Sequence, residues 1–377
     1  MKTLLSFLLT FTLSNLVIAQ TTAVPDANFE QALINLGYDF GTPDGTVITA
    51  NIDTVATLNI MNNNISDLTG IEDFTALSDL NCEGNLLTSI DVTQNSALNI
   101  LQCNSNQLTS LNVTQNIDLT ELRCAGNQLT NLDVTQNSDL HFLWCSNNLL
   151  TSLDVTQNTI IDTLFCELNQ LTSLNVTQNT DLLLLACFTN QLASLDVSQN
   201  ILLTKLYCEE NALTDLDVSQ NEELILLYCG ANQLVCLNVK NGNNINFLPN
   251  ALKALWNPGL TCIEVDNPTW SVANWTNVDS PNLFSLNCAP CALGIYENNF
   301  SNLICYPNPT KGNISIDIGE VYSKINVIVR NSIGKKVFQN KIGTSDRIEF
   351  FLEGESGVYI IEISSENKKA VLRIVKE

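Results

Sequence analysis

The chain has 377 residues, with 39 Asp or Glu against 16 Lys or Arg, and a formal net charge of -23. Residues 1–299 hold 30 of the acidic residues and 5 of the basic ones, whereas residues 300–377 hold 9 and 11. A protein this acidic repels the phosphate backbone of nucleic acid, so we exclude nucleic acid as a partner. The change in charge balance places a domain boundary near residue 300.

Residues 1–19 read as a signal peptide. Lys2 precedes an apolar stretch, and Val17-Ile18-Ala19 fits the small-residue rule for cleavage. We therefore expect a mature chain that starts at Gln20 and lies outside the cytoplasm, as a monomer. No later segment offers the ~20 uninterrupted apolar residues of a spanning helix, so we predict no transmembrane segment.

Residues 20–54 are predicted to form an N-terminal cap. An amphipathic helix is expected to start near Asp26 and to cover the first repeat. Its apolar side should consist of Phe29, Ala32, Leu33 and Leu36.

Residues 55–244 consist of tandem repeats. Aligned on cysteine, each unit reads Leu-x-x-Leu-x-Cys-x-x-Asn-x-Leu-Thr-x-Leu-Asp-Val-Thr-Gln-Asn. Before these units, residues 55–74 follow a 22-residue version of the repeat, with Ile60 in place of the cysteine. A fixed period indicates stacked structural units rather than a disulfide framework. Eight cysteines follow at a spacing of 21 residues: Cys82, Cys103, Cys124, Cys145, Cys166, Cys187, Cys208 and Cys229.

This pattern resembles the leucine-rich repeat over about residues 50–265. The 22-residue unit is similar to the internalin type, and the 21-residue units resemble repeats of secreted bacterial surface proteins. The resemblance implies a solenoid of parallel β-strands, a curved right-handed coil.

The apolar positions of each unit should point into one shared core. In the first 21-residue unit these are Leu80, Cys82, Leu87, Ile90 and Val92. We expect the cysteine where the interior admits only a small apolar group. Metal binding and disulfides are weaker alternatives, because a straight row closes no tetrahedron and in-register strands suit disulfides poorly.

An asparagine recurs at one position of every unit and should bond to loop backbone between coils. The series is Asn85, Asn106, Asn127, Asn148, Asn169, Asn190, Asn211 and Asn232.

Residues 245–290 are predicted to cap the far end of the solenoid, and residues 291–304 to form a linker. The repeat pattern frays there, and we place Asn250 at the cysteine position. Cys236, Cys262 and Cys288 are the disulfide candidates of an exported chain, with the pairing left open.

Residues 305–377 alternate apolar and polar residues in short segments separated by turns, which predicts a small antiparallel, immunoglobulin-like sandwich. The segment resembles the C-terminal sorting domain of type IX secretion. That resemblance implies the type IX machinery as a partner and the outer cell surface of a Gram-negative bacterium as the location, and leaves cleavage of the tail open. A plain adhesive module is the alternative. The motif residues are Tyr306, Pro307, Asn308, Pro309, Gly312, Gly357, Tyr359 and Lys376.

We predict no catalytic site, no metal and no cofactor. His141 is the one histidine of the chain and occupies a variable repeat position, where a solvated surface role is expected. A recurring aspartate, as in Asp91 and Asp133, predicts an outward row on the convex side.

The positions beside the inward residues vary, and they become aromatic along the chain. On a leucine-rich repeat these positions face the concave surface. Clustered exposed aromatics mark a contact surface, although mutual packing of the rings is the alternative. The predicted ligand-binding residues are Arg123, Phe142, Trp144, Phe165, Glu167, Phe188, Tyr207, Glu209 and Tyr228.

The sequence therefore predicts a secreted or cell-surface leucine-rich repeat protein that is not an enzyme and binds a protein or glycan through its concave face. The alternatives are a structural spacer of the cell surface and an accessory part of a polysaccharide-degrading system.

Overall fold

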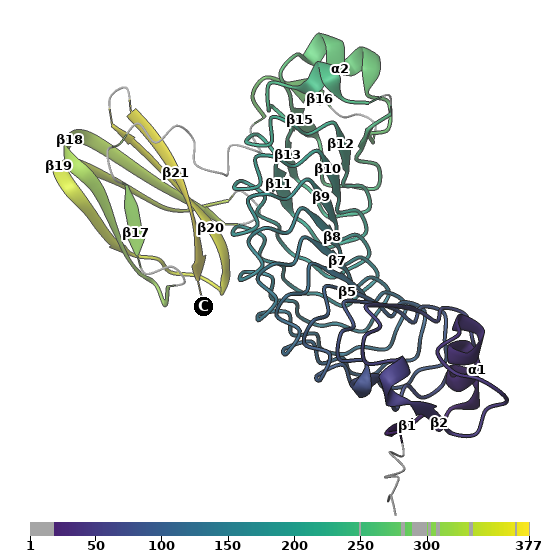
Figure 1. Cartoon of the computed structure of the whole chain (residues 1–377). Coiled ribbons are helices and arrows are strands. Elements are labelled where there is room, and N and C mark those ends of the chain that lie inside the picture. The colour runs from purple at the N-terminus through teal and green to yellow at the C-terminus, as the bar shows by residue number, and fades with distance from the viewer. Residues whose placement is uncertain are drawn as a thin grey trace, which may run out of the picture. The chain divides into compact units, whose positions relative to one another are not determined.

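The computed structural model describes residues 19–248, 250–279, 283–288, 300, 303–306, 310–331, 335–365 and 368–376. The predicted signal peptide and most of the predicted linker lie outside these residues. A parallel leucine-rich repeat solenoid of about 11 turns is followed by a small antiparallel β region curled into a half-barrel (Figure 1). The chain divides into two compact units, Met1–Leu174 and Asn175–Glu377, which we describe separately.

The first unit begins with a cap. Strands β1 (Thr21–Ala23) and β2 (Thr46–Ile48) pair antiparallel, and helix α1 (Ala27–Leu36) lies between them in sequence. Short 3-10 helices follow at η1 (Thr49–Asn51) and η2 (Ile71–Asp73).

Asp26 is the N-cap of α1 and fixes the helix to the first repeat. Its Oδ1 accepts bonds from the N–H groups of Asn28 and Phe29, and its Oδ2 accepts from the N–H and hydroxyl of Ser66. Partial burial raises the pKa of Asp26, but these bonds outweigh it and lower the pKa below the usual value. Leu36, expected on the buried side, is 46% exposed because it ends the helix beside the Gly37 C-cap.

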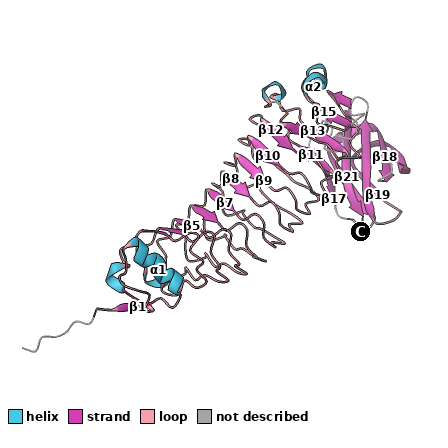
Figure 2. Ribbon diagram, turned by 90° about the vertical axis from the view of Figure 1, so that its right-hand side faces the viewer, coloured by secondary structure: helices cyan, strands magenta, loops and turns pink. Residues whose placement is uncertain are grey.

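Six parallel strands carry the repeats of the first unit. Each has three residues, and its central leucine is fully buried while the flanking residues face outward. Figure 2 shows β7 and β8 stacked as successive rungs, with β5 further along the same sheet. The strands are β3 (Thr57–Asn59), β4 (Asp79–Asn81), β5 (Ile100–Gln102), β6 (Glu121–Arg123), β7 (Phe142–Trp144) and β8 (Thr163–Phe165).

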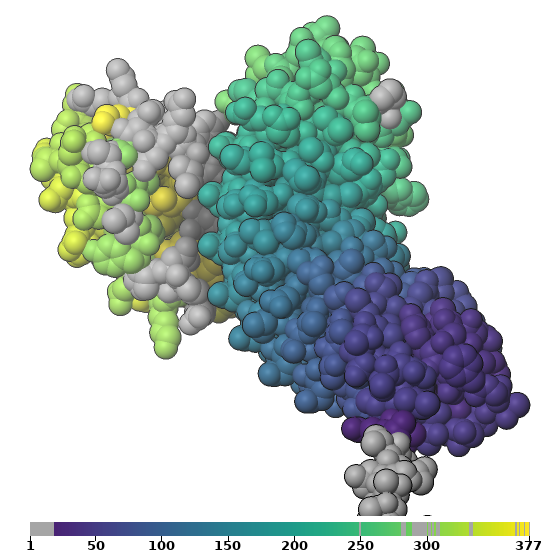
Figure 3. Space-filling view, in the orientation of Figure 1, coloured from purple at the N-terminus to yellow at the C-terminus, as the bar shows by residue number. Residues whose placement is uncertain are grey.

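The predicted interior is confirmed with one exception. Leu80, Cys82, Leu87 and Val92 are fully buried, as are their equivalents in the following coils. Ile90 is half-buried because it lies beside the differently shaped 22-residue coil. On the face shown in Figure 3, the coils of the first unit (purple to blue) pack without visible gaps.

The asparagine ladder bridges neighbouring coils as predicted. In Asn127, Nδ2 donates to the carbonyls of Cys103 and Cys124, both at 3.0 Å, and Oδ1 accepts from the N–H of Leu108 at 2.9 Å. One side chain thus bonds three buried backbone groups, and each of the two carbonyls also accepts from the ladder asparagine of a neighbouring position, Asn106 or Asn148.

A second ladder was not predicted. The last asparagine of each Thr-Gln-Asn segment is fully buried, and Nδ2 of Asn116 donates to the carbonyls of Val92 and Asn95 at 3.0 and 2.8 Å. The recurring aspartate is exposed and bonds within its own turn. Oδ1 of Asp91 accepts from the N–H and hydroxyl of Thr93, and these bonds lower the pKa of Asp91.

The ladder cysteines are free thiols inside the core, and each is fully buried. Burial raises the pKa of Cys82 and of Cys145 to about 12, because a thiolate is strongly disfavoured away from water. The row of thiols therefore fills space in the core and is chemically unreactive under native conditions.

In the second unit, β9, β10, β12 and β14 continue as parallel neighbours, and β11, β13, β15 and β16 form a separate parallel sheet. The strands are β9 (Leu184–Ala186), β10 (Lys205–Tyr207), β11 (Asp215–Asp217), β12 (Leu226–Tyr228), β13 (Cys236–Asn238), β14 (Leu252–Lys253), β15 (Cys262–Glu264) and β16 (Leu283–Ser285). The cap adds η3 (Asn244–Asn246) and helix α2 (Pro268–Asn274).

The predicted register at β14 was wrong. Ala254, not Asn250, takes the cysteine position, because it follows β14 and is fully buried. Asn257 takes the ladder position: Oδ1 accepts from the N–H of Leu234, and Nδ2 donates to the carbonyls of Cys229 and Ala254. The loop before β14 absorbs the extra residues.

The predicted C-terminal sandwich was also wrong. The described strands form one five-stranded antiparallel sheet, in which the expected short segments merge into two long strands. Register shifts near Asp317 and Tyr322 let β18 bend, so residues that look like turn signals lie within the curved strand. The strands are β17 (Ile304–Tyr306), β18 (Asn313–Asn331), β19 (Lys336–Phe351), β20 (Gly357–Ser365) and β21 (Lys368–Lys376).

Candidate functional site

The first ring cluster consists of Phe142, Trp144 and Phe165, on the outward positions of β7 and β8. All three rings are half-buried. The centroid of Phe165 lies 5.8 Å from that of Phe142 and 6.2 Å from that of Trp144, both in tilted geometry. The rings therefore pack against one another and still present part of their surface to solvent.

Arg123 extends the first ring cluster onto β6. Its guanidinium lies 4.8 Å from the ring centroid of Phe142, and its Nε is paired with Glu121 on the same strand. Burial, and next the charge of Glu121, raises the pKa of Asp79 on β4. The outward positions of these strands thus combine three aromatic rings and one cation with the acidic side chains of Glu121 on β6 and Asp79 on β4.

Glu167 lies two positions after Phe165 and is half-buried. Within the described part of the chain, its Oε2 and the hydroxyl of Ser146 are both buried without a well-formed hydrogen bond, although the Ser146 hydroxyl lies close enough to favour the charged carboxylate. Burial raises the pKa of Glu167, and the dipoles of Ser146 and of its own backbone offset this only in part. Desolvated carboxylates of this kind are enriched at functional sites.

The second ring cluster consists of Tyr207 and Tyr228, at the ends of β10 and β12. The rings meet edge to face with centroids 5.2 Å apart, and the ammonium of Lys253 lies 3.8 Å from the ring centroid of Tyr228. Burial, followed by Tyr228 and Glu209, raises the pKa of Tyr207. Phe188 lies in the same unit, one position after the inward Cys187, and is half-buried.

Glu209 repeats the situation of Glu167 beside the second ring cluster. It also follows a ladder cysteine, and its Oε2 is buried without a hydrogen-bond partner among the described residues. Burial is the main cause of its raised pKa. The next coil has Gly230 at this position, where a Cβ would lie 2.8 Å from the carbonyl oxygen of Leu255.

Sequence reasoning missed Lys205, Lys253 and Trp256. Lys205 starts β10, two positions before Tyr207, and the repeat pattern did not single it out. Lys253 and Trp256 were hidden by the wrong register, which left them in the cap; Trp256 is 76% exposed. Reading Ala254 as the small interior residue would have found both.

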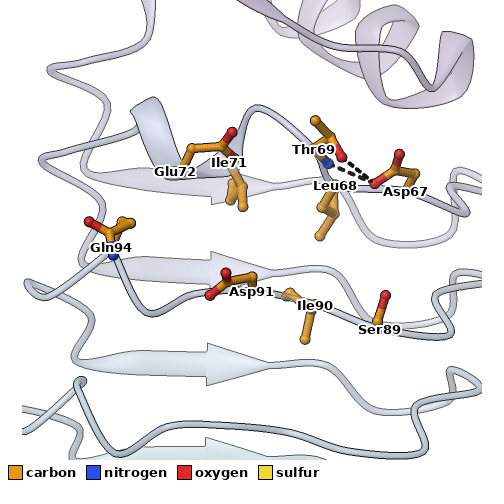
Figure 4. A pocket seen from close by; sticks show the side chains of 9 residues that line it. All are labelled: Asp67, Leu68, Thr69, Ile71, Glu72, Ser89, Ile90, Asp91 and Gln94. Atoms are coloured by element: carbon orange, nitrogen blue, oxygen red, sulfur yellow. Dashed lines mark hydrogen bonds between the residues drawn. The ribbon is translucent and has the colours of Figure 1, made fainter.

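A pocket of about 360 Å³ lies between the first two coils of the first unit (Figure 4). Leu68, Ile71 and Ile90 supply apolar lining, and Asp67, Glu72 and Asp91 supply carboxylates. The carboxylate of Asp67 accepts bonds from the N–H and hydroxyl of Thr69. The pocket was not predicted, although the change from a 22-residue to a 21-residue coil marks its place.

The cysteines of the solenoid end are disulfide-bonded. Cys262 and Cys288 form one disulfide, with Cα atoms 5.8 Å apart, and Cys236 is also disulfide-bonded. The bond joins β15 to the residues just after β16.

Part of the predicted sorting motif gathers around one turn of the C-terminal sheet. The hydroxyl of the buried Tyr359 donates to the carbonyl of Glu355 at 2.7 Å, and Nζ of Lys376 donates to the carbonyl of Gly354. Gly357 pairs with Lys376 in register. Gly312 has φ 123°, and a Cβ there would lie 2.6 Å from the ring of Phe351. Tyr306 is on β17, and Pro307, Asn308 and Pro309 lie outside the described residues.

His141 is exposed, with Nδ1 3.8 Å from Oδ2 of Asp162. Within the described ranges, no helix has both the length and the apolar character needed to cross a membrane.

Comparisons with known proteins agree with this architecture. Residues 304–377 match the family described as "Secretion system C-terminal sorting domain". No match was found among curated proteins. The functional domain of InlJ from Listeria monocytogenes, described as including a cysteine ladder, is similar with a TM-score of 0.56 and 25% identity, covering 95% of this chain and 99% of that chain.

A second similar structure is the internalin InlF from Listeria monocytogenes, with a TM-score of 0.51 and 18% identity over 74% of this chain and 96% of that chain. At this identity the likeness concerns the fold alone. The protein is therefore a leucine-rich repeat solenoid with internalin-like structural neighbours and Cys-containing repeats of about 21 residues, and it ends in a type IX secretion sorting domain.

Proposed function

We propose that this secreted protein binds a macromolecule, a protein or a glycan, through its strand face, meaning the outward residues of the parallel strands that carry the two ring clusters. The type IX sorting domain implies secretion or display on the outer surface of a Gram-negative bacterium. In this proposal the sorting domain directs export and the solenoid performs the binding.

The observation that carries the proposal is the contrast between constant interior positions and rings on the variable positions. The strand faces hold Phe142, Trp144 and Phe165 in one unit and Tyr207 and Tyr228 in the other, each half-buried with part of its surface open. Half-open aromatics beside charged side chains are the composition of interaction hot spots.

The two unpartnered carboxylates support the same proposal. Burial of a carboxylate oxygen that lacks a well-formed hydrogen bond disfavours folding, so desolvation makes Glu167 and Glu209 costly to the solenoid. Each lies two positions after an aromatic residue of a ring cluster. A role in ligand recognition accounts for carboxylates at these two positions.

The test uses the purified full chain on a printed array of glycans and peptides. Trp144→Ala and Tyr207→Ala are expected to weaken binding by about tenfold or more, because each removes a ring from the contact surface. Ile117→Ala removes a 58% exposed apolar side chain outside both clusters and serves as the matched control. Ring variants that bind like wild type would leave the solenoid as a spacer and overturn the proposal.

A further inference from the structure

The basic residues of the solenoid are few, and most lie on the strand face. Besides Lys2 in the predicted signal peptide, residues 1–299 contain four basic residues against 30 acidic ones: Arg123, Lys205, Lys240 and Lys253. Three of these four occupy outward strand positions, on β6, β10 and β14. Two of the three, Lys205 and Lys253, belong to the second unit and its ring cluster.

The second unit places two lysines around its ring cluster. Tyr207, Tyr228 and Lys253 occupy the same position on three successive strands. Lys205 stands at the other end of β10. The backbones of Lys205 and Lys253 are separated by two strand spacings of ~4.8 Å and by two residues of ~3.3 Å along the strand, which gives about 12 Å.

The ammonium groups of Lys205 and Lys253 are available to a ligand. Neither Lys205 nor Lys253 forms an ion pair with a carboxylate of the described residues. Lys253 is exposed and rests on the Tyr228 ring, an arrangement that keeps its ammonium free to donate. The other outward strand positions around the rings, Leu184, Ala186 and Leu226, hold no acid. Glu209, just after β10, is close enough for its charge to interact with Lys253 and Tyr207, without forming an ion pair.

We propose that Lys205, Tyr207, Glu209, Tyr228 and Lys253 form a subsite for an acidic glycan bearing a sugar carboxylate. This deepens the proposed function and rests on it. The lysines pair with the sugar carboxylate, the ring faces contact the apolar face of a sugar, and the phenol hydroxyls and the Glu209 carboxyl bond to sugar hydroxyls.

The backbone pairing favours a glycan over an acidic peptide. β10 is paired on both sides, with β9 and β12, and β12 is paired with β10 and β14. The face therefore offers no free strand edge to the N–H and C=O groups of a peptide, which commonly bind by adding a strand. Sugar hydroxyls need only side-chain partners.

The surrounding charge limits the ligand further. The 30 acidic residues of residues 1–299 repel a continuous polyanion, whereas screening over about 8 Å at physiological salt lets two lysines act locally. A short acidic oligosaccharide with only a few carboxylates satisfies both conditions.

Calorimetric titration of the full chain with trigalacturonate, at physiological ionic strength, tests the proposal. Trigalacturonate is expected to bind, and neutral galactotriose to bind about tenfold more weakly or not at all. Lys253→Gln and Tyr228→Ala should each weaken trigalacturonate binding by about tenfold. The matched control is Lys240→Gln, since Lys240 lies beyond β13 and donates to the carbonyl of Leu286.

Four results would overturn the proposal: no binding of trigalacturonate, equal binding of galactotriose, equal losses in Lys240→Gln and Lys253→Gln, or tighter binding of a hexaglutamate peptide. If the array binding of wild type depends on the ring clusters while trigalacturonate does not bind, this inference fails and the proposed function stands. If array binding survives ring substitution, the proposed function fails as well.

Discussion

The interior of the solenoid and its strand face use the same three-residue strands for opposite purposes. The central leucines, the ladder cysteines and both asparagine series repeat almost unchanged and are buried. The outward positions of the same strands range from Asn81 and Gln102 through Trp144 and Phe165 to Tyr207 and Tyr228. The interior thus determines stability, and in the proposed function the face determines what is bound.

The largest expected effect comes from breaking the interior. Asn127→Ala leaves the buried N–H of Leu108 without its partner, and an unsatisfied buried group costs about 1–3 kcal/mol. It also removes one of the two asparagine donors from each of the Cys103 and Cys124 carbonyls, which keep the donors Asn106 and Asn148. We expect the free energy of unfolding to fall by about 3 kcal/mol, measured by urea denaturation. The exposed neighbour Gln128→Ala is the control and should change it by less than about 0.5 kcal/mol.

A second prediction concerns the buried thiols and alkaline pH. Their pKa is raised in the folded chain, so above pH 9 the unfolded chain releases thiol protons that the folded chain retains. Stability is therefore complete below pH 9 and declines as pH rises toward 12. Urea denaturation at several pH values measures the slope.

The control for the alkaline decline is Cys124→Ala, which removes one thiol from the row. Its stability should fall less steeply between pH 9 and 12 than that of wild type. An identical slope would show that other groups cause the decline.

The smallest expected effect concerns Glu167 beside the strand face. Glu167→Gln removes a desolvated charge, and since burial raises its pKa, the folded chain is disfavoured once pH exceeds the unfolded value of 4.5. At pH 7 we expect Glu167→Gln to be as stable as wild type or more stable by about 1 kcal/mol or less, as measured by urea denaturation. A clear loss of stability, absent from the exposed control Glu222→Gln, would assign Glu167 a structural role.

Most of the solenoid could be predicted from the sequence, because a strict period identifies the inward residues without further information. Asn127 and Cys124 are examples in which the pattern indicates both burial and partner. The buried role of Asn116 went unpredicted, although its repetition was equally regular. Periodicity failed where the chain departs from it: Ile90 beside the 22-residue coil, and Lys253 after the irregular loop.

The C-terminal domain could be predicted less well, for a physical reason. Alternation of apolar and polar residues identifies strands, but it does not show whether a polar interruption is a turn or a bend within one strand. Around Gly319 and Thr344 the interruption lies inside the paired strands β18 and β19. The unpartnered oxygens of Glu167 and Glu209 also depend on three-dimensional packing that no repeat pattern encodes.

The most direct test compares interior and face in the same preparations: array binding and urea unfolding for wild type, Asn127→Ala and Trp144→Ala. The account predicts that Asn127→Ala loses stability yet binds normally while folded, and that Trp144→Ala stays within about 1 kcal/mol of wild-type stability yet loses binding. Normal binding by folded Trp144→Ala, with binding lost in folded Asn127→Ala, would contradict it.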